Sequence, residues 1–249
     1  MSSGSKTALI TGSGQNIGRG IANQLALAGF NIIVNGSRNQ DAAEAVAAEV
    51  RAHGVEALVA MGNVGIKAEA EALAKAGLDH FGKIDVLVNN AAIRPHGPFL
   101  DMNDDEWQKV MDVDLNAAIW LSRVILPGMI DNGWGRILSF SGMNAQRGYP
   151  GASAVSVAKH AGWGLTTAFA GGVGITGLPG KRHAPSHFPP HDAARANDQQ
   201  VSALPQVHPT RRLGRTEDIG AMVVYLCSKN GGFVNGQMLQ INGGVVMQF

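Results

Sequence analysis

The clearest candidate for chemistry is a glycine-containing turn near the N-terminus. Gly12, Gly14 and Gly18 follow a short apolar run and precede a helical pattern. A dinucleotide site of this kind needs a tight turn, close approach of the backbone to the pyrophosphate, and free N–H groups at a helix start. The strand–turn–helix context therefore favours nucleotide binding over a plain glycine-rich turn. The predicted cofactor contacts are Gly12, Ser13, Gly14, Gln15, Asn16, Ile17 and Gly18.

A second candidate is a set of three histidines, His183, His187 and His191, spaced four residues apart. On a helix this spacing would gather the imidazoles on one face, where they could ligate a metal ion. Pro185 and Pro189 exclude that helix, because proline removes a backbone donor and clashes with the preceding turn. We therefore expect a polar loop and no metal site.

The elements that position these residues alternate along the chain. The apolar patterns predict strands over residues 7–11, 31–35, 57–61, 85–89, 136–140 and 237–241. Helices are predicted over residues 17–28, 41–52, 67–81, 105–129, 154–170 and 216–228. This alternation indicates an α/β fold, a Rossmann-like doubly wound parallel sheet flanked by helices on both faces. Because no linker or repeat is visible, we expect a single domain over residues 1–249.

Residues 171–207 interrupt the alternation. They are rich in Pro, His, Arg and Ala and poor in large apolar residues. Prolines break helices and central strands. We therefore expect an irregular, mobile substrate-loop region over this stretch.

Composition limits the classes of function. The chain has 45% hydrophobic and 16% charged residues and a net charge of +1, which is typical of a globular protein and offers no basic surface for nucleic acid or an anionic membrane. Cys227 is the single cysteine and lies in an apolar run, which favours a buried structural thiol over a reactive one. No segment resembles a signal peptide or approaches the length of a membrane span, so we expect a cytoplasmic protein.

Several motifs, in order, resemble those of the short-chain dehydrogenase/reductase family. Thr11-Gly12-x-x-x-Asn16-x-Gly18 is similar to its Thr-Gly-x-x-x-Gly-x-Gly, and Asn89-Asn90-Ala91-Ala92 to its Asn-Asn-Ala-Gly. The match continues through residues 135–137, 212–219, 235–237 and 242–244 and so covers nearly the whole chain apart from 171–207. The resemblance, in particular to proteins like the 3-oxoacyl-ACP reductases, implies an NAD(P)(H)-dependent oxidoreductase of a carbonyl or alcohol. Asn16 departs from glycine, but asparagine adopts positive φ readily.

The resemblance also implies where the rest of the cofactor binds. Beyond the glycine turn, the implied contacts are Asn63, Val64, Asn90 and Ala91. NAD-binding relatives place a carboxylate at the end of the second strand for the ribose 2′-hydroxyl. This chain has Ser37 and Arg38 there, which suit a 2′-phosphate. We therefore expect NADP(H) rather than NAD(H), the alternative for Arg38 being a solvated turn cation.

The catalytic positions implied by the resemblance are mostly substituted. Lys159, which in the family holds the cofactor ribose and lowers the pKa of a tyrosine, is present. The position of that proton-exchanging tyrosine is Val155, and the position of the serine that binds the substrate carbonyl is Gly142. The asparagine that anchors a water relay is replaced by Asp114, which could pair with Lys159. Tyr149, in the loop before the helix, is more typical of loop packing than of a replacement acid.

The family's sixth strand is also altered. Residues 174–180 are a few residues too short for it, and no threonine follows to bind the nicotinamide carboxamide. We therefore expect this strand to be shortened or lost.

Three functions remain open. The first is an NADP(H)-dependent oxidoreductase in which a water near Lys159 or Asp114 supplies the proton, at a cost of about a hundredfold in rate. The second is a catalytically inactive relative that binds nucleotide or a partner, and the third is non-redox chemistry on the same fold. The resemblance implies a homotetramer or homodimer formed through the long fourth and fifth helices and the last strand. The apolar ending at 245–249 fits such an interface, although it could pack on its own domain.

Overall fold

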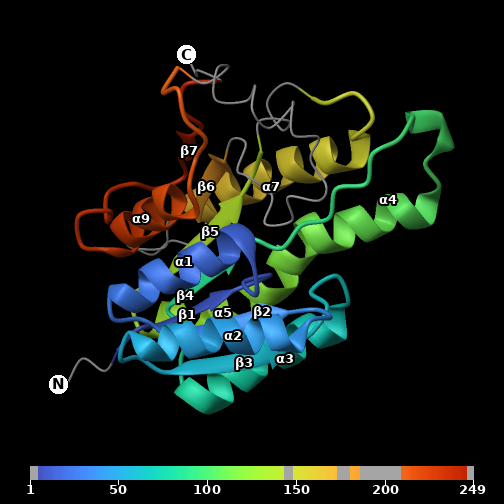
Figure 1. Cartoon of the computed structure of the whole chain (residues 1–249). Helices are drawn as coiled ribbons and strands as arrows, with labels where there is room; N and C mark the ends of the chain where they lie inside the picture. The colour runs from blue at the N-terminus through green and yellow to red at the C-terminus, as the bar shows by residue number, and fades with distance from the viewer. Residues whose placement is uncertain (1–4, 143–147, 173–179, 186–208, 246–249) are drawn as a thin grey trace.

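The computed structural model describes residues 5–142, 148–172, 180–185 and 209–245 (Figure 1). Within these residues, seven strands pair in parallel into one sheet. They are β1 (Thr7–Ile10), β2 (Asn31–Gly36), β3 (Ala57–Met61), β4 (Val86–Asn89), β5 (Arg136–Phe140), β6 (Gly180–Pro185) and β7 (Met238–Ile241). Their order is β3-β2-β1-β4-β5-β6-β7. The order reverses between β1 and β4, and ligands of such sheets bind at the carboxyl ends of the strands beside this point.

Helices cover both faces of the sheet. Their bounds are α1 (Asn16–Leu27), α2 (Gln40–Ala52), α3 (Lys67–Phe81), α4 (Asp104–Met111), α5 (Ala117–Asp131), α7 (Ser153–Gly172) and α9 (Thr216–Cys227). A 3-10 turn, η1 (Phe99–Asp101), precedes α4, and a π-helical turn, η2 (Asp112–Asn116), joins α4 to α5. The predicted Rossmann-like fold is therefore confirmed.

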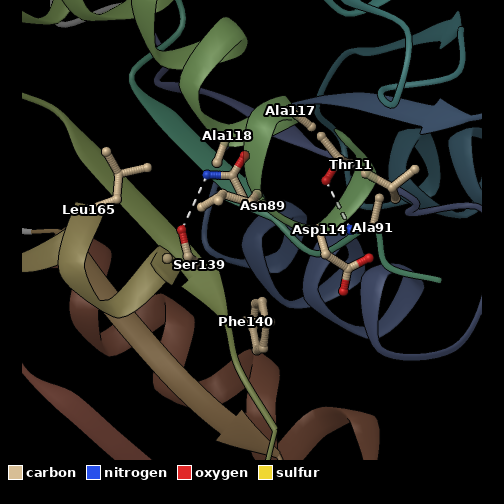
Figure 2. Close-up of a pocket in the computed structure, with 12 residues that line it drawn as sticks. Thr11, Asn89, Ala91, Asp114, Ala117, Ala118, Ser139, Phe140 and Leu165 are labelled. Carbon is tan, nitrogen blue, oxygen red and sulfur yellow. Dashed lines mark hydrogen bonds between the residues drawn. The ribbon is translucent and has the colours of Figure 1, made fainter. Parts of the chain in front are cut away.

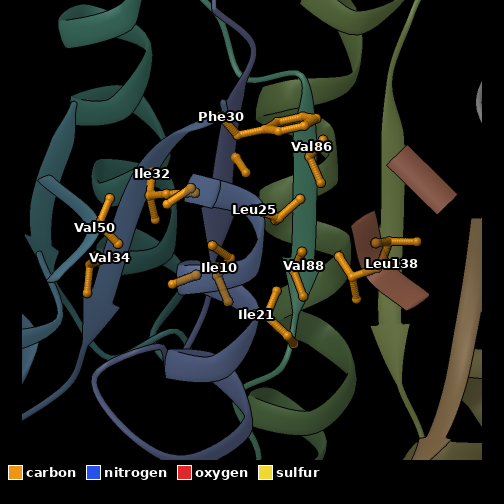
Figure 3. Packing of buried hydrophobic residues seen from close by; sticks show 14 of the residues in the cluster. Ile10, Ile21, Leu25, Phe30, Ile32, Val34, Val50, Val86, Val88 and Leu138 are labelled. Atoms are coloured by element: carbon orange, nitrogen blue, oxygen red, sulfur yellow. The ribbon is translucent and has the colours of Figure 1, made fainter. Parts of the chain in front are cut away.

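The two faces bury separate apolar cores because successive strand residues point to opposite sides. Ile10 of β1 and Leu25 of α1 lie in one core, where α1, α2 and α9 pack on the sheet (Figure 3). Leu9, one residue before Ile10, lies in the other core with Leu121 of α5. Cys227 is 2% exposed in the first core, as expected for a structural thiol.

The expectation about the sixth strand was wrong. A six-residue strand forms, but from residues 180–185, later in the chain than the segment expected to supply it. It pairs with β5 and β7 in parallel, so part of the stretch predicted to be an irregular loop is sheet. Pro185 is the last residue of this strand, so the missing backbone donor is kept out of the strand interior. Residues 173–179 and 186–207 of the predicted loop, with His187 and His191, lie outside the described residues.

The expectation that no segment approaches a membrane span also needs correction. Within the described residues, one helical stretch, Asp104–Asp131, is long and apolar enough by length and composition. Leu121, Ile125 and Met129 from this stretch are buried in the core under the sheet, and core helices of globular proteins pass the same test. Packing in this core accounts for part of its apolar character, and the cytoplasmic location remains a prediction.

Candidate nucleotide and reaction site

The glycine turn lies at the carboxyl end of β1, beside the point where the strand order reverses. Gly12 has φ +63°, and Asn16 has φ +50°, as predicted for an asparagine in a glycine position. A Cβ at Gly18 would lie 2.5 Å from the Gly12 carbonyl oxygen and 2.7 Å from the Cα of Ser13. Only glycine therefore allows α1 to begin this close to the turn.

The turn presents the start of α1 to a ligand. Gln15 is the N-cap of α1 and makes no side-chain hydrogen bond to the first turn within the described chain. Helix-start N–H groups without such a cap, together with the helix dipole, suit an anion such as a pyrophosphate.

Asn35 braces the turn, a role that the sequence did not reveal. Its Oδ1 accepts from the Gly12 N–H (3.1 Å), and its Nδ2 donates to the carbonyls of Ala60 (3.0 Å) and Gly62 (3.1 Å). Ser13 is wholly buried, and its hydroxyl donates to Ile10 O (2.8 Å) and accepts from Asn35 N (3.0 Å). Ser13 thus shapes the turn with its side chain rather than offering that group to a ligand.

The segment after β4 is tied to the same turn. Asn90 Nδ2 donates to Thr11 O (2.9 Å) and Gly12 O (3.1 Å). The Thr11 hydroxyl accepts from the N–H groups of Asn90 and Ala91, both at 3.0 Å. These four bonds hold β1 and β4 together at their carboxyl ends, where a cofactor would lie across both.

The end of β2 carries exposed polar groups. Ser37 and Arg38 are exposed, and Arg38 forms no ion pair or hydrogen bond with the rest of the described chain. The Asn39 side chain caps α2 by accepting from Ala42 N (3.0 Å). An exposed arginine beside a helix start suits a phosphate group.

At the expected adenine end, Asn63 is largely used within the protein. Its Oδ1 accepts from Gly65 N (3.0 Å), and its own N–H donates to Glu69 Oε2 (2.7 Å). Val64, next in the chain, is buried. The side-chain nitrogen of Asn63, Nδ2, has no partner among the described residues and is free to donate to an adenine.

At the reaction end, Asp114 and Lys159 form the predicted ion pair. Lys159 Nζ lies 2.9 Å from Asp114 Oδ2, with side-chain exposures of 8% and 0%. Asp114 Oδ1 accepts from the N–H of Ile93 (2.9 Å), which follows the Asn-Asn-Ala-Ala motif. The π-helical turn η2 carries Asp114, and such turns are frequent at functional sites.

The substituted catalytic positions remain without acid or hydroxyl groups. Val155 is 5% exposed and packs in an apolar cluster with Val110 and Ala158. A Cβ at Gly142 would meet no atom of the described chain within 4 Å. A serine would therefore fit at 142, whereas a tyrosine at 155 would have to leave the apolar cluster.

A small cavity with both polar and apolar lining residues lies between β4, β5, η2 and α7 (Figure 2). Its free volume of about 20 Å³ has room for a water molecule. Asn89 Nδ2 donates to Ser139 Oγ (3.3 Å), while Asn89 Oδ1 is buried without a hydrogen-bond partner in the described chain. Asp114 also lines the cavity, so a water here could donate to both side chains.

The structure also pairs His96, on the loop after β4, with Tyr149, a contact that the sequence did not reveal. The rings of His96 and Tyr149 meet edge to face with centroids 5.8 Å apart. Gly97 N donates to Gly151 O (2.9 Å), which fixes the loop after β4 against the start of α7. These contacts join segments about 50 residues apart in sequence, and no spacing pattern announces them.

Within the described residues, no three His, Cys, Asp or Glu side chains gather in a way that could hold a metal ion. Asp114 and Lys159 form one pair of titratable groups, and His96 and Tyr149 form a ring pair on the loops after β4 and before α7.

Comparison with known proteins agrees with this architecture. Residues 6–179 match the family model described as short chain dehydrogenase. The chain is 32% identical to 3-oxoacyl-[acyl-carrier-protein] reductase FabG of Staphylococcus epidermidis, over 97% of this chain and 99% of that protein. It is 35% identical to the uncharacterized oxidoreductase YohF of Escherichia coli K12, over 97% and 96%. A crystal structure of a provisionally assigned short-chain alcohol dehydrogenase from Sinorhizobium meliloti 1021 superposes with a TM-score of 0.90 at 25% identity, covering 96% of each chain.

Proposed function

Because the chain belongs to the short chain dehydrogenase family, whose members are oxidoreductases, we propose that it binds NADP(H) and interconverts a small carbonyl compound and its alcohol at a low rate. The observation that carries this proposal is the glycine turn. Its positive-φ residues, the close approach at Gly18 and the bonds from Asn35 and Asn90 are all in place. A bound dihydronicotinamide would supply the hydride.

The preference for NADP(H) rests on the end of β2. Arg38 is exposed and without an acidic partner in the described chain, and no carboxylate occupies residues 35–38. A guanidinium forms charge-assisted hydrogen bonds with a phosphate, whereas a ribose hydroxyl gains little from it. The 2′-phosphate is therefore the group that distinguishes the two cofactors at this position.

The low rate follows from the substituted positions. With Val155 and Gly142 in place of the tyrosine and serine, positioned proton transfer is lost at both, and such groups contribute about a hundredfold or more. Hydride transfer itself depends mainly on holding the two carbons together, which Lys159 and the glycine turn can still favour.

A second candidate, nucleotide binding without turnover, is supported by the burial of Val155. Its side chain belongs to an apolar cluster with Ile93 and Leu115 and offers nothing to a substrate. The ion pair with Asp114 also engages Lys159, which limits what its ammonium can do for a substrate. In this case the protein would act through its bound nucleotide or a partner.

Calorimetric titration with NADPH and NADH shows whether the protein binds a nucleotide at all. Turnover of a panel of carbonyl compounds then distinguishes the reductase from nucleotide binding without catalysis. We expect NADPH to bind more tightly than NADH. Steady oxidation of NADPH with any aldehyde or ketone would support the reductase. Binding without turnover across the panel would support the second candidate, and absence of binding would refute both.

We also propose that the protein is a homotetramer or homodimer in the cytoplasm. Exposed apolar side chains on α7, α9 and the following loop support an interface: Val157, Tyr225 and Phe233 are 44%, 45% and 103% exposed. Sedimentation equilibrium tests this proposal, since a monomer at micromolar concentration would contradict it.

A further inference from the structure

We infer that His96 donates the proton to the substrate oxygen in place of the missing tyrosine. This inference rests on the proposed reductase function. Val155 and Gly142 cannot transfer a proton, and the Lys159 ammonium is engaged by Asp114 at 2.9 Å. Imidazole is the side chain most often used to exchange protons near neutral pH.

The loop that carries His96 is held at its start and near its end by hydrogen bonds to other elements. At its start, Ile93 N–H donates to Asp114 Oδ1 (2.9 Å), and Ile93 packs in the cluster that holds Val155. Near its end, Gly97 N–H donates to Gly151 O (2.9 Å). Gly151 stands four residues before Val155, just ahead of α7, so this bond ties the loop that carries His96 to the segment that leads into Val155.

The imidazole ring of His96 packs closely against the backbone of Gly151. A Cβ at Gly151 would lie 2.7 Å from Cε1 and 2.8 Å from Nε2 of the His96 ring, so the ring occupies the space that any other residue at 151 would fill. On another side the ring meets Tyr149 edge to face, at an interplanar angle of 65°. Tyr149 therefore orients the ring, while the exposure of His96 lets water restore a transferred proton.

The step balances as a two-electron reduction. The carbonyl carbon accepts hydride from the dihydronicotinamide, the carbonyl π bond breaks, and its oxygen takes the proton from a ring nitrogen of His96. The nicotinamide is oxidised, the carbonyl becomes an alcohol, and the neutral imidazole regains a proton from water. In the reverse direction, the same nitrogen accepts the alcohol proton.

The first test compares wild type, His96→Ala and the control His80→Gln in NADPH oxidation with a panel of aliphatic and aromatic aldehydes and ketones. His80 lies at the end of α3 beside Glu56, away from this loop. We expect His96→Ala to lower kcat about a hundredfold with unchanged NADPH affinity by calorimetry, and free imidazole to restore much of the rate. His80→Gln should match wild type.

A second readout does not depend on turnover. With NADP⁺ and the reactive ketone together no hydride can move, so the complex persists for NMR. We expect the His96 imidazole resonance, identified by its loss in His96→Gln, to shift on addition of the ketone. It should not shift with NADP⁺ alone by a comparable amount.

The outcomes are distinct. A wild-type rate in His96→Ala would overturn this assignment and leave the reductase standing. A loss of rate that imidazole does not restore, with no ketone-dependent shift, would reduce His96 to a structural role and overturn it as well. NADPH binding by wild type without any turnover would contradict the proposed reductase, and the assignment would fall with it.

Discussion

The ammonium of Lys159 lies 2.9 Å from a carboxylate oxygen of Asp114, and the Asp114 side chain is wholly buried. An amide at this position would orient the same neighbours through Ile93 but would leave the ammonium without a counter-charge. In a buried pair of this kind, removing either charge destabilises the protein, because the remaining unpaired buried charge costs several kcal/mol.

Replacing Asp114 by Asn should therefore destabilise the protein, although the two side chains are nearly isosteric. We expect the free energy of unfolding to fall by about 3 kcal/mol near neutral pH, since Lys159 is left charged and buried. The double variant Asp114→Asn with Lys159→Met should recover most of this loss. Urea unfolding of wild type, Asp114→Asn, Lys159→Met and the double variant measures the coupling. An Asp114→Asn variant as stable as wild type would contradict it.

Replacing Gly18 by Ala should abolish nucleotide binding. Its Cβ would lie 2.5 Å from a backbone oxygen and 2.8 Å from Asn90 Nδ2, so the turn or the start of α1 must shift. Gly164→Ala in α7 is the matched control, because its Cβ meets no described atom within 4 Å and alanine favours helix by about 1 kcal/mol. Calorimetry should find no NADPH binding to the first variant and normal binding to the second.

Replacing Arg38 by Gln should weaken NADPH selectively. Loss of a charge-assisted phosphate contact costs about 1.5–3 kcal/mol, which corresponds to at least a tenfold rise in Kd. The affinity for NADH should be unchanged, as should both affinities in the control Lys75→Gln on the exposed face of α3. Equal losses for the two cofactors would place Arg38 outside the 2′-phosphate site.

Restoring the family's residues with Gly142→Ser and Val155→Tyr should raise turnover. Space exists for the serine, because nothing described lies within 4 Å of a Cβ at 142. The phenol would place a proton donor at the position that the family uses, four residues from the retained Lys159. Steady-state kinetics on the carbonyl panel measures the effect, with Gly142→Ser alone as the control. A double variant no faster than wild type would contradict the prediction.

Acid should weaken the anchoring of α9 through Asp218. The pKa of Asp218 is held below its ordinary value of 3.8 by hydrogen bonding from Arg212, opposed by partial burial and aided by the Arg215 backbone N–H. A lowered folded-state pKa gives stability that is complete above the unfolded value and is lost as pH falls through the folded one. Asp218→Asn should therefore be less stable than wild type at pH 6, and the difference should shrink towards about pH 3. An equal difference at both pH values would contradict this origin.

The regular part of the fold was predictable because each element obeys a local pattern. The strand over 136–140 and the helix over 67–81 were predicted with the bounds that the structure shows. The glycine turn was predictable for a similar reason, since Gly12 and Gly18 must be adjacent to the first strand and helix. The pairing of Asp114 with Lys159 followed from the resemblance, which placed both at one site.

What failed depended on contacts that local sequence does not encode. β6 forms at residues 180–185 because β5 and β7 offer backbone partners on both sides, despite a polar and proline-containing sequence. The role of Asn35 depends on the carbonyls of residues 60 and 62. The position of the His96 ring depends on the absence of a side chain at Gly151. The helix predicted over 105–129 contains a π-helical turn that no residue type announces.

That π-helical turn lets one helix serve two cores. Before it, Val110 faces the cluster with Val155 and α7; after it, Leu121 and Ile125 face the core under the sheet. One additional residue in a turn changes the phase of all later side chains by about 100°. Deleting a single residue at 113 would bring the two halves into one phase, and one of the two apolar stripes would then turn towards water. The number of residues in this helix is therefore fixed more strictly than the identity of its side chains, because a single insertion or deletion would rotate one apolar face out of its core.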